Sequence, residues 1–485
     1  MQEKIPHWLT KRAYLSPEAP AIELDTGEVI TFIELKNKAE QLARQLANLG
    51  IGKNDKVGLF FGNEREMIIA IHSISYLGSV AVLLNTRLTK SEITYQVEDA
   101  EVKLVLTSDS LYDHVLEMNL PSIVKRFSEI REEEEKDVPL VCEISLQDPY
   151  TIVYTSGTTG NPKGVVHTYG NHWWSAIGSV LNLGLTEQDK WLAVLPLFHV
   201  SGFSICMRSV LYGIPIFLME KFDAEAVNEA IISKGVTIIS VVTVMLQRLY
   251  DELGEKSYPK SFRCMLIGGG PVPRPLLEKA AAKNIPVFQS YGLTETSSQI
   301  VTLSPTEALK KLGSAGKPLF PGQLHIHNPD EQGVGEIFVK GPMVTKGYFK
   351  NPEANNKSFT NGWLATGDLG YVDEDGFLYV VDRRTDLIIS GGENIYPSEI
   401  ESVLSGYQGV KEVGVVGKKD PTWGEVPVAF IVKDERIEKD ELIQFAKEHL
   451  ASYKVPKEIY FLDHLPRTAS NKLMRNVLKE QINKE

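Results

Sequence analysis

Hydrophobic and polar residues follow two alternating patterns along the first hundred residues. Thr31 and Glu34 form a capping box before an apolar-periodic stretch that ends near Gly50, which predicts a helix. Short apolar runs typical of buried strands alternate with such helical stretches. The pattern predicts strands over residues 56–61, 80–84 and 102–107, a helix over 64–77, and a second capping box at Thr89 and Glu92. Strands that alternate with helices indicate βαβ units and parallel sheets.

The rest of the chain divides into a long α/β region and a shorter C-terminal section. The apolar stretch VTIISVVTVML from Val236 is too short to cross a bilayer and predicts a buried strand that runs into a helix. From Phe359 onward, turn-rich pieces lead to the sequence DRRTD, and a shorter α/β section with a Lys-rich tail follows. We therefore place a domain boundary near Thr385, between residues 1–384 and residues 385–485.

Composition and charge narrow the classes of partner. Hydrophobic residues make up 43% of the 485, enough for more than one core, and the net charge of −12 disfavours nucleic acid and membrane surfaces. The acidic run REEEEKD from Arg131 predicts a solvated loop or helix end.

Cys142, Cys206 and Cys264 show no CxxC spacing, which disfavours disulfides and zinc and favours the cytoplasm. The first twenty residues hold no apolar core of a secretory signal, and we expect no membrane insertion.

The strongest local signal is a loop rich in glycine and hydroxyl groups, YTSGTTGNPKG, which follows a predicted strand over residues 151–154. Glycines allow tight turns and close approach to a ligand, and exposed N–H groups with a lysine can hold an anion. The loop is not a Walker A sequence, because Pro162 precedes the lysine and Gly164 follows it. We predict that it binds phosphate groups through Thr155, Ser156, Gly157, Thr158, Thr159, Gly160 and Lys163.

TSGTTGxPKG resembles the signature loop of the adenylate-forming superfamily, which comprises acyl- and aryl-CoA ligases, adenylation domains and luciferases. Further motifs of that family occur once each and in the family's order. They are LPLFHVSG (195–202), GGGPVP (268–273), SYGLTET (290–296), TGD (366–368), DRRTD (382–386) and RTASNKLMR (467–475). The resemblance spans essentially the whole chain. It implies a large N-terminal domain of layered α/β subdomains with mixed sheets and a β-barrel-like part, and a small, mobile α+β C-terminal domain.

The resemblance also implies where ATP and Mg²⁺ bind. In the family the phosphate loop holds the β- and γ-phosphates, and the acid of the SYGLTET motif, here Glu295, helps to hold Mg²⁺ together with a loop hydroxyl, here Thr155. Taken alone, Glu295 would suit the N-terminus of a helix. The ribose is met by Asp368 and Arg383. The remaining nucleotide residues implied are Gly268, Gly269, Gly270, Ser290, Tyr291, Gly292, Leu293 and Thr294, with Tyr291 stacked on adenine.

A two-step reaction is implied as well. ATP and a carboxylate first give an acyl-adenylate, aided by Lys472, and the thiol of coenzyme A then attacks it after the C-terminal domain has rotated about a hinge at Thr385. The segment SGGENIYPSEIE would then bring Gly391 and Gly392 to the thiol, and a third capping box, Ser398 and Glu401, predicts a helix there. The sequence departs from the family in two places: Asn471 replaces the glycine usual before Lys472, and a threonine stands at the hinge.

The identity of the acid rests on resemblance. The segments GGGPVPRPLLE, KLGSAGKPL and RTASNKL resemble the branch of the family that activates an aromatic keto-acid with two carboxylates for menaquinone biosynthesis. His199, Ser201 and Ser298 are the candidate acyl-pocket donors, with His199 also a catalytic candidate, although alone it would suggest a core histidine. Pairing of Arg208 with the second carboxylate is an alternative, but Arg208 is not counted among the site residues, because such an arginine more often lies on a helix surface. A medium-chain fatty acid or benzoate ligase, and a stand-alone adenylation protein that loads a carrier protein, remain alternatives.

Overall fold

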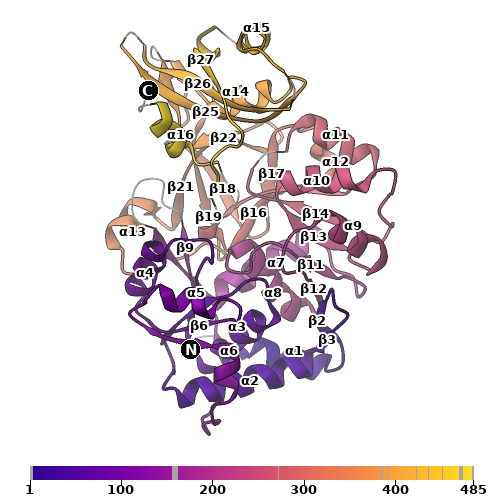
Figure 1. The fold of residues 1–485 in the computed structure, drawn as a ribbon, viewed down its shortest axis with the longest axis vertical. Coiled ribbons are helices and arrows are strands. Elements are labelled where there is room, and N and C mark those ends of the chain that lie inside the picture. Colours follow the sequence, from indigo (N-terminus) through magenta and orange to yellow (C-terminus); the bar gives the residue numbers. More distant parts are fainter. Residues whose placement is uncertain are drawn as a thin grey trace.

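The computed structural model describes residues 4–155, 162–270, 272–383, 386–390, 393–421, 423–434, 436–450, 452–468 and 473–482, without the side chains of residues 383, 393 and 394. Figure 1 shows the N-terminal segments at one end of the long axis and the C-terminal segments, orange to yellow, at the other. Between them lie strands from the middle of the chain. The molecule is therefore built as layers stacked along its long axis, with the last hundred residues at one end.

The first large sheet has the strand order β10-β9-β5-β4-β6-β7. Its strands are parallel except the edge strand β10, which pairs antiparallel with β9. The strands are β4 (Lys56–Phe60), β5 (Val80–Leu83), β6 (Val102–Thr107), β7 (Ile123–Arg126), β9 (Pro149–Thr155) and β10 (Lys163–Thr168). The helices of this part are α2 (Phe32–Asn48), α3 (Arg65–Leu77), α4 (Lys90–Asp99), α5 (Tyr112–Glu117) and α6 (Phe127–Arg131).

Local sequence signals explain these elements. The Glu34 carboxylate accepts a 2.8 Å hydrogen bond from the Thr31 N–H, and Glu92 does the same for Thr89, so both predicted capping boxes are confirmed. Helix α3 is buried from Met67 to Leu77 without interruption, as expected for a helix enclosed between two layers. The acidic run from Arg131 begins where α6 ends and continues as a loop, as predicted.

The second sheet has more strands than the first, and part of it is parallel. Its path is β18-β19-β21-β22-β17-β16-β15-β14-β13-β11-β12-β2-β3, with β20 beside β21. The parallel part and its antiparallel end strands contain β2 (Pro20–Leu24), β3 (Val29–Thr31), β11 (Trp191–Ala193), β12 (Ile216–Leu218), β13 (Ile238–Val241), β14 (Cys264–Ile267), β15 (Val287–Leu293) and β16 (Ser298–Leu303). The apolar stretch from Val236 forms β13 and then enters α10, as the sequence predicts.

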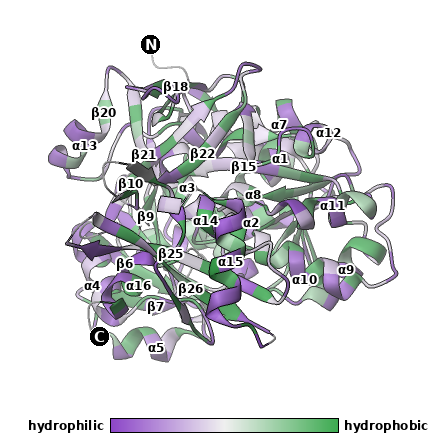
Figure 2. Ribbon diagram, turned by 90° about the horizontal axis from the view of Figure 1, so that it is seen from above, coloured by the Kyte–Doolittle hydropathy of each residue, from purple (hydrophilic) through white to green (hydrophobic). Residues whose placement is uncertain are grey.

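Helices cover this sheet and contribute to the core that it shares with the first. They are α1 (Trp8–Leu15), α7 (Tyr169–Leu183), α8 (Val200–Tyr212), α9 (Ala224–Ser233), α10 (Thr243–Leu253), α11 (Arg274–Ala282), α12 (Pro305–Ala308) and α13 (Pro352–Ser358). A short pair, β1 (Lys4–Pro6) and β8 (Glu143–Ser145), lies beside them. One buried hydrophobic cluster joins Leu59 and Leu104 of the first sheet to Ile216 and Ile238 of the second. Figure 2 shows hydrophobic and hydrophilic residues alternating along outer helices such as α9 and α15.

The expected barrel-like part is an antiparallel extension of the second sheet. It contains β17 (Ser314–Pro318), β18 (Gln323–His327), β19 (Gly335–Lys340), β20 (Phe359–Thr360), β21 (Trp363–Val372) and β22 (Leu378–Arg383). The described strand pairings leave β18 at an end of the path, so they do not close this part into a barrel. It remains an open sheet, and its strand β22 contacts α14 (Pro397–Leu404) of the C-terminal residues.

The C-terminal residues form a separate α+β unit. Its sheet has the order β24-β23-β26-β25, with β27 beside β26. The elements are β23 (Ile388–Ser390), β24 (Glu393–Ile395), α14 (Pro397–Leu404), β25 (Val410–Asp420), β26 (Gly424–Lys433), α15 (Lys439–His449), β27 (Glu458–Phe461) and α16 (Arg475–Ile482). The change of sheet falls between β22 and β23, where the sequence places the domain boundary. That boundary, near Thr385, stays a prediction.

The predicted capping box at Ser398 and Glu401 is wrong, although a helix does begin there. The cap position of α14 is Tyr396, and Ser398 lies inside the first turn, where its N–H donates to Asp382 at 3.0 Å. The Glu401 carboxylate accepts from Arg475 and from the N–H of Val415. Long-range ionic contacts therefore take the place of the local bond. Within the described part of the chain, no helix is long and apolar enough to cross a membrane.

Candidate functional site

The ends of the phosphate loop are held by two edge strands and one helix. Thr155 ends β9 and lies opposite Lys163, the first residue of β10. The Tyr154 hydroxyl donates to the Asp99 carboxylate of α4 at 2.6 Å, and the Tyr95 hydroxyl donates to the Pro162 carbonyl at 3.3 Å. Tyr95 and Asp99 are four residues apart and so share a face of α4. One helix face therefore contacts both ends of the loop.

The part of the loop that the sequence singles out most strongly lies outside the described residues. These residues are Ser156, Gly157, Thr158, Thr159 and Gly160. The ends of the loop show only that a chain reversal joins β9 to β10 at the edge of the first sheet.

The SYGLTET segment forms a tight turn between β15 and β16. Gly292 is required there, because a Cβ atom at this position would lie 2.1 Å from the carbonyl oxygen of Ser298. The 3₁₀ turn Thr294–Thr296 follows, and Ser298 then adopts φ 133°, which is strained for a residue with a side chain. Strain of this kind gathers at functional sites, which suits a turn that carries Thr294 and Glu295.

A chain of buried polar groups ties this turn to β10. His167 Nε2 lies 2.7 Å from the Thr294 carbonyl oxygen, and burial lowers the pKa of His167 to about 4, so the ring is neutral at pH 7. Because a carbonyl only accepts, Nε2 carries the proton. Nδ1 then accepts from the Thr151 hydroxyl at 3.3 Å, and this hydroxyl accepts from His172 Nε2 at 3.0 Å. Each hydrogen in this series of hydrogen bonds has an acceptor. The series fixes the carbonyl of Thr294 to β10, the strand that follows the phosphate loop.

The predicted nucleoside residues come together from strands β15, β21 and β22 of the second sheet. The Tyr291 hydroxyl donates to the buried Asp368 carboxylate at 2.8 Å, and Asp368 lies opposite Arg383 in the β21–β22 ladder. The Ser290 hydroxyl donates to the Ile267 carbonyl at 2.9 Å, directly before the glycine loop. The residues gathered here from distant parts of the chain are Gly268, Gly269, Gly270, Ser290, Tyr291, Gly292, Leu293, Asp368 and Arg383. Their nucleotide-binding roles stay predictions.

The candidate acyl residues gather around helix α8. His199 occupies the N-cap position of α8, and Ser201 lies in its first turn. Arg208 lies seven residues after Ser201, on the same helix face, and its guanidinium donates to the Ser298 hydroxyl at 3.2 Å. Arg208 thus links Ser298 to the face of α8 on which Ser201 lies. The expectation that Arg208 lies on the surface is wrong, since only 1% of the residue is exposed.

The Arg208 guanidinium is an unusual buried cation. It lies 5.0 Å above the Trp191 ring, and no described carboxylate lies within 4.0 Å of it. Its Nε atom is buried, and no described atom accepts its hydrogen. Burial lowers the pKa of Arg208, which expresses the cost of a desolvated charge. A buried cation of this kind is a suitable site for an anionic group of a ligand.

The residues assigned to the hinge, to the thiol step and to the catalytic lysine lie outside the described part. Thr385, Gly391, Gly392 and Lys472 are among the residues that the structure does not describe. The described C-terminal residues contain a cluster of charges centred on Arg475.

Arg475 of α16 bridges acids on both sides of the boundary. Its guanidinium lies 2.7 Å from the Glu401 carboxylate, 3.2 Å from that of Asp386 and 3.8 Å from that of Asp382. Asp382 belongs to β22 of the N-terminal part, whereas Glu401 belongs to α14 of the C-terminal part. Arg475 therefore joins the last strand of one unit to two helices of the other.

We expect Arg475→Ala to lower the free energy of unfolding of the C-terminal unit by about 3 kcal/mol, because two largely buried carboxylates lose their partner. Urea unfolding measures the effect. The matched control is Arg436→Ala, whose exposed guanidinium lies 3.5 Å from Glu438, and we expect that change to cost less than about 0.5 kcal/mol. Equal effects of the two substitutions would contradict a stabilising role for the cluster.

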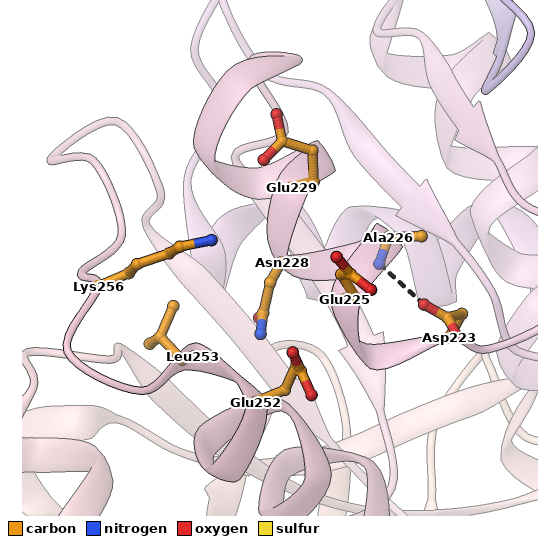
Figure 3. A pocket seen from close by; sticks show the side chains of 8 residues that line it. All are labelled: Asp223, Glu225, Ala226, Asn228, Glu229, Glu252, Leu253 and Lys256. Carbon is orange, nitrogen blue, oxygen red and sulfur yellow. Dashed lines mark hydrogen bonds between the residues drawn. The ribbon is translucent and has the colours of Figure 1, made fainter.

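A separate hollow of about 410 Å³ lies between α9 and α10 (Figure 3). Its lining carries four carboxylates, of Asp223, Glu225, Glu229 and Glu252, with one lysine, Lys256. None of the predicted site residues lines it. A lining of this charge repels phosphates and carboxylates, so this hollow does not suit the substrates that the motifs indicate.

Comparison with known proteins identifies the class. The profile of the AMP-binding enzyme family matches residues 9–349, and that of the AMP-binding enzyme C-terminal domain matches residues 399–472. The protein belongs to the AMP-binding enzyme family. Among its relatives is the 2-succinylbenzoate–CoA ligase of Oceanobacillus iheyensis, which is 55% identical over 482 residues, 99% of this chain and 100% of the relative.

Solved structures of the o-succinylbenzoate CoA synthetase of Bacillus subtilis, 47% identical, are similar along the whole chain. The complex with the acyl-adenylate intermediate has a TM-score of 0.93 and covers 98% of both chains. The complex with ATP and magnesium also has a TM-score of 0.93 and covers 98% of this chain and 100% of the other. A double mutant bound with a product analogue has a TM-score of only 0.76, at 47% identity, with 99% and 98% covered. At equal identity, this difference indicates that the present structure has the arrangement of the ATP and adenylate complexes.

Three residues of the assembled site were missed by sequence reasoning. Arg208 was set aside as a surface residue, and His167 and Tyr348 lie outside the family motifs considered. The hydroxyl of Tyr348 donates to the Glu295 carboxylate at 3.0 Å. The run KGVVHTYG offered a weak signal for His167, because a polar residue interrupts an apolar strand directly after the phosphate loop.

Proposed function

We propose that the chain joins 2-succinylbenzoate to coenzyme A, with ATP as the energy source, in the cytoplasm and for menaquinone (vitamin K2) biosynthesis. The products are 2-succinylbenzoyl-CoA, AMP and diphosphate, and an acyl-adenylate is the intermediate. Support comes from relatives with this activity that match the chain from end to end. The single observation that carries the choice of acid is the buried, carboxylate-free Arg208 beside Ser298.

The first half-reaction brings two anions together. The succinyl carboxylate attacks the α-phosphorus of ATP, and diphosphate leaves, so the protein's task is to neutralise charge and to position the two groups in line. Lys163 and Lys472 supply positive charge. Asp368 and Arg383 hold the ribose, and the tyrosine ring of Tyr291 stacks on adenine.

The residues present suit a magnesium ion. Glu295 offers carboxylate oxygen and Thr155 offers a hydroxyl, the hard donors that Mg²⁺ prefers in addition to substrate phosphates. Within the described ranges, no three His, Cys, Asp or Glu side chains form a metal cluster. An ion that takes most of its ligands from phosphates and water does not need such a cluster. When bound, the ion offsets phosphate charge in the transition state.

The acid has a second carboxylate, on its aromatic ring, that must be bound without reacting. Arg208 supplies the charge for it, and Ser298 and Ser201 supply hydroxyl donors on the same side of α8. His199, at the start of α8, lies beside the acyl group. A fatty acid or simple benzoate would leave the cation of Arg208 buried without an anion, which is costly.

The second half-reaction transfers the acyl group to the thiol. The C-terminal unit carries Lys472 away and brings Gly391 and Gly392 to the thiol path, with Thr385 as the hinge. The arrangement shared with the adenylate complex supports the first of the two states, and the lower score against the product-analogue complex supports the existence of another.

A panel of acids tests the proposal. Purified protein is given ATP, Mg²⁺ and CoA, and diphosphate release is compared for 2-succinylbenzoate, benzoate and medium-chain fatty acids. We expect 2-succinylbenzoate to be turned over and the other acids to be poor substrates. Turnover of a fatty acid or of benzoate with 2-succinylbenzoate inert would contradict it. Transfer to a holo-carrier protein but not to free CoA would favour the carrier-loading alternative.

A further inference from the structure

A buried tyrosine lies between two charged groups of the proposed ATP site. Tyr348 is 7% exposed, and its hydroxyl donates to Oε1 of Glu295 at 3.0 Å. The ammonium nitrogen of Lys163 lies over the ring of the same tyrosine, 5.0 Å from its centroid. A single side chain thus contacts the lysine after the phosphate loop with its face and the acid of the SYGLTET turn with its hydroxyl.

The backbone around Tyr348 holds that side chain in place. The N–H of Phe349 donates to the Gly164 carbonyl at 2.7 Å, and Tyr348 forms a β-bridge with Val165. The N–H of Tyr348 donates to the Asn355 side chain at 2.7 Å, and the Asn355 amide returns a bond of 3.1 Å to the Tyr348 carbonyl. These contacts attach Tyr348 to β10, the strand that begins at Lys163, and to α13.

The same segment also holds the acid turn. The N–H of Thr345 donates to the Glu295 carbonyl at 2.8 Å, and the Thr345 hydroxyl donates to the Val166 carbonyl of β10. Burial, and next the charge of Glu295, raise the pKa of Tyr348, so its hydroxyl keeps the proton that it donates. Both the main chain and the side chain of Glu295 are therefore fixed to one short segment.

We propose that Tyr348 is a positioning residue for ATP and Mg²⁺, which orients the Glu295 carboxylate through its hydroxyl and the Lys163 ammonium through its ring. The inference rests on the proposed function, because it takes Glu295 and Lys163 as parts of the ATP site. The hydroxyl and the ring make separable contributions. A charge-assisted bond restricts the carboxylate to one orientation, whereas the ring face attracts the cation whether or not the hydroxyl is present.

Equilibrium ATP binding to the full chain, with and without Mg²⁺, separates the two contributions. We expect Tyr348→Phe to weaken ATP binding about tenfold in the presence of Mg²⁺, the scale of one bond to a charged group, and to leave Mg²⁺-free binding unchanged. We expect Tyr348→Leu to weaken Mg²⁺-free binding as well, by about threefold, because the cation then loses the ring. The KM for the acid should not change in Tyr348→Phe.

The double substitution Tyr348→Phe with Glu295→Gln is the most direct test of the positioning role. If Tyr348 acts through Glu295, then Tyr348→Phe has no further effect on Mg²⁺-dependent binding in a Glu295→Gln background. The matched control is Tyr460→Phe, which removes a tyrosine–glutamate bond of 2.5 Å to Glu458 in the C-terminal unit and should leave ATP binding unchanged.

Different results would overturn the positioning role of Tyr348 and the proposed function. Equal loss from Tyr348→Phe in both backgrounds, or wild-type binding by Tyr348→Phe, would overturn the positioning role while the wild-type protein still binds ATP with Mg²⁺. Wild-type protein that does not bind ATP would overturn the proposed function itself. Melting temperatures of the variants distinguish loss of binding from loss of folding.

Discussion

Lys472→Ala should lower the rate of acyl-adenylate formation by on the order of 10²–10³-fold, the scale for losing one contact to developing charge in a transition state. In the proposed mechanism the lysine meets the reacting phosphate only in the first half-reaction, because the C-terminal unit is proposed to move before the thiol attacks. Transfer of the acyl group from presynthesised adenylate to CoA should therefore proceed at nearly the wild-type rate. The two half-reactions are measured separately, by diphosphate release without CoA and by thioester formation from added adenylate.

Lys479→Ala is the matched control, since Lys479 is another lysine of the same tail and lies on α16. It should leave both half-reactions unchanged. If Lys472→Ala slowed both half-reactions to the same extent, the assignment of the lysine to one of two domain arrangements would be wrong.

Arg208→Gln should lower kcat/KM for 2-succinylbenzoate by on the order of 10²-fold, because truncating one partner of a buried charge pair costs about 2–5 kcal/mol. The substitution keeps a hydrogen-bond donor near Ser298 and removes only the charge. The comparison substrate is 4-oxo-4-phenylbutanoate, which retains the succinyl carboxylate and lacks the ring carboxylate. Its kcat/KM should fall little, since it brings no anion to Arg208.

The substrate comparison also controls for folding, because a collapsed pocket would lose both acids. Arg126→Gln is the matched protein control: this arginine stacks 4.1 Å above the Tyr112 ring, as Arg208 stacks on Trp191, but is exposed. It should leave both substrates unaffected. Equal loss of the two acids in Arg208→Gln would show that the arginine supports the fold and does not bind the second carboxylate.

Elements whose signals are local were predicted well. The strand at 102–107 and the capping boxes at Thr31 and Thr89 depend on neighbouring residues, and the structure confirms them. The capping box at Ser398 failed, because Glu401 is bound by Arg475, 74 residues away. A single sequence does not show such a distant partner.

The same difference between local signals and distant partners explains which residues of the site could be predicted. Tyr291 and Asp368 could be named from motifs, and the structure places them 2.8 Å apart. Arg208 was considered but not placed in the site, and Tyr348 was not named, because the significance of both residues lies in what they contact. Arg208 donates to Ser298 at the end of the strained turn, and Tyr348 forms a bridge with Val165 of β10. Both contacts join residues that are at least 90 positions apart in the sequence.

In the proposed reaction, charges gathered around ATP first promote formation of an acyl-adenylate, and its acyl group then passes to a thiol while AMP leaves. A single-turnover experiment with α-labelled ATP, Mg²⁺, 2-succinylbenzoate and excess protein tests it directly. Without CoA, a stable protein-bound acyl-adenylate should accumulate, and addition of CoA should convert it to AMP and 2-succinylbenzoyl-CoA within one turnover. Absence of labelled adenylate before CoA is added, or an adenylate that CoA does not discharge, would contradict the account.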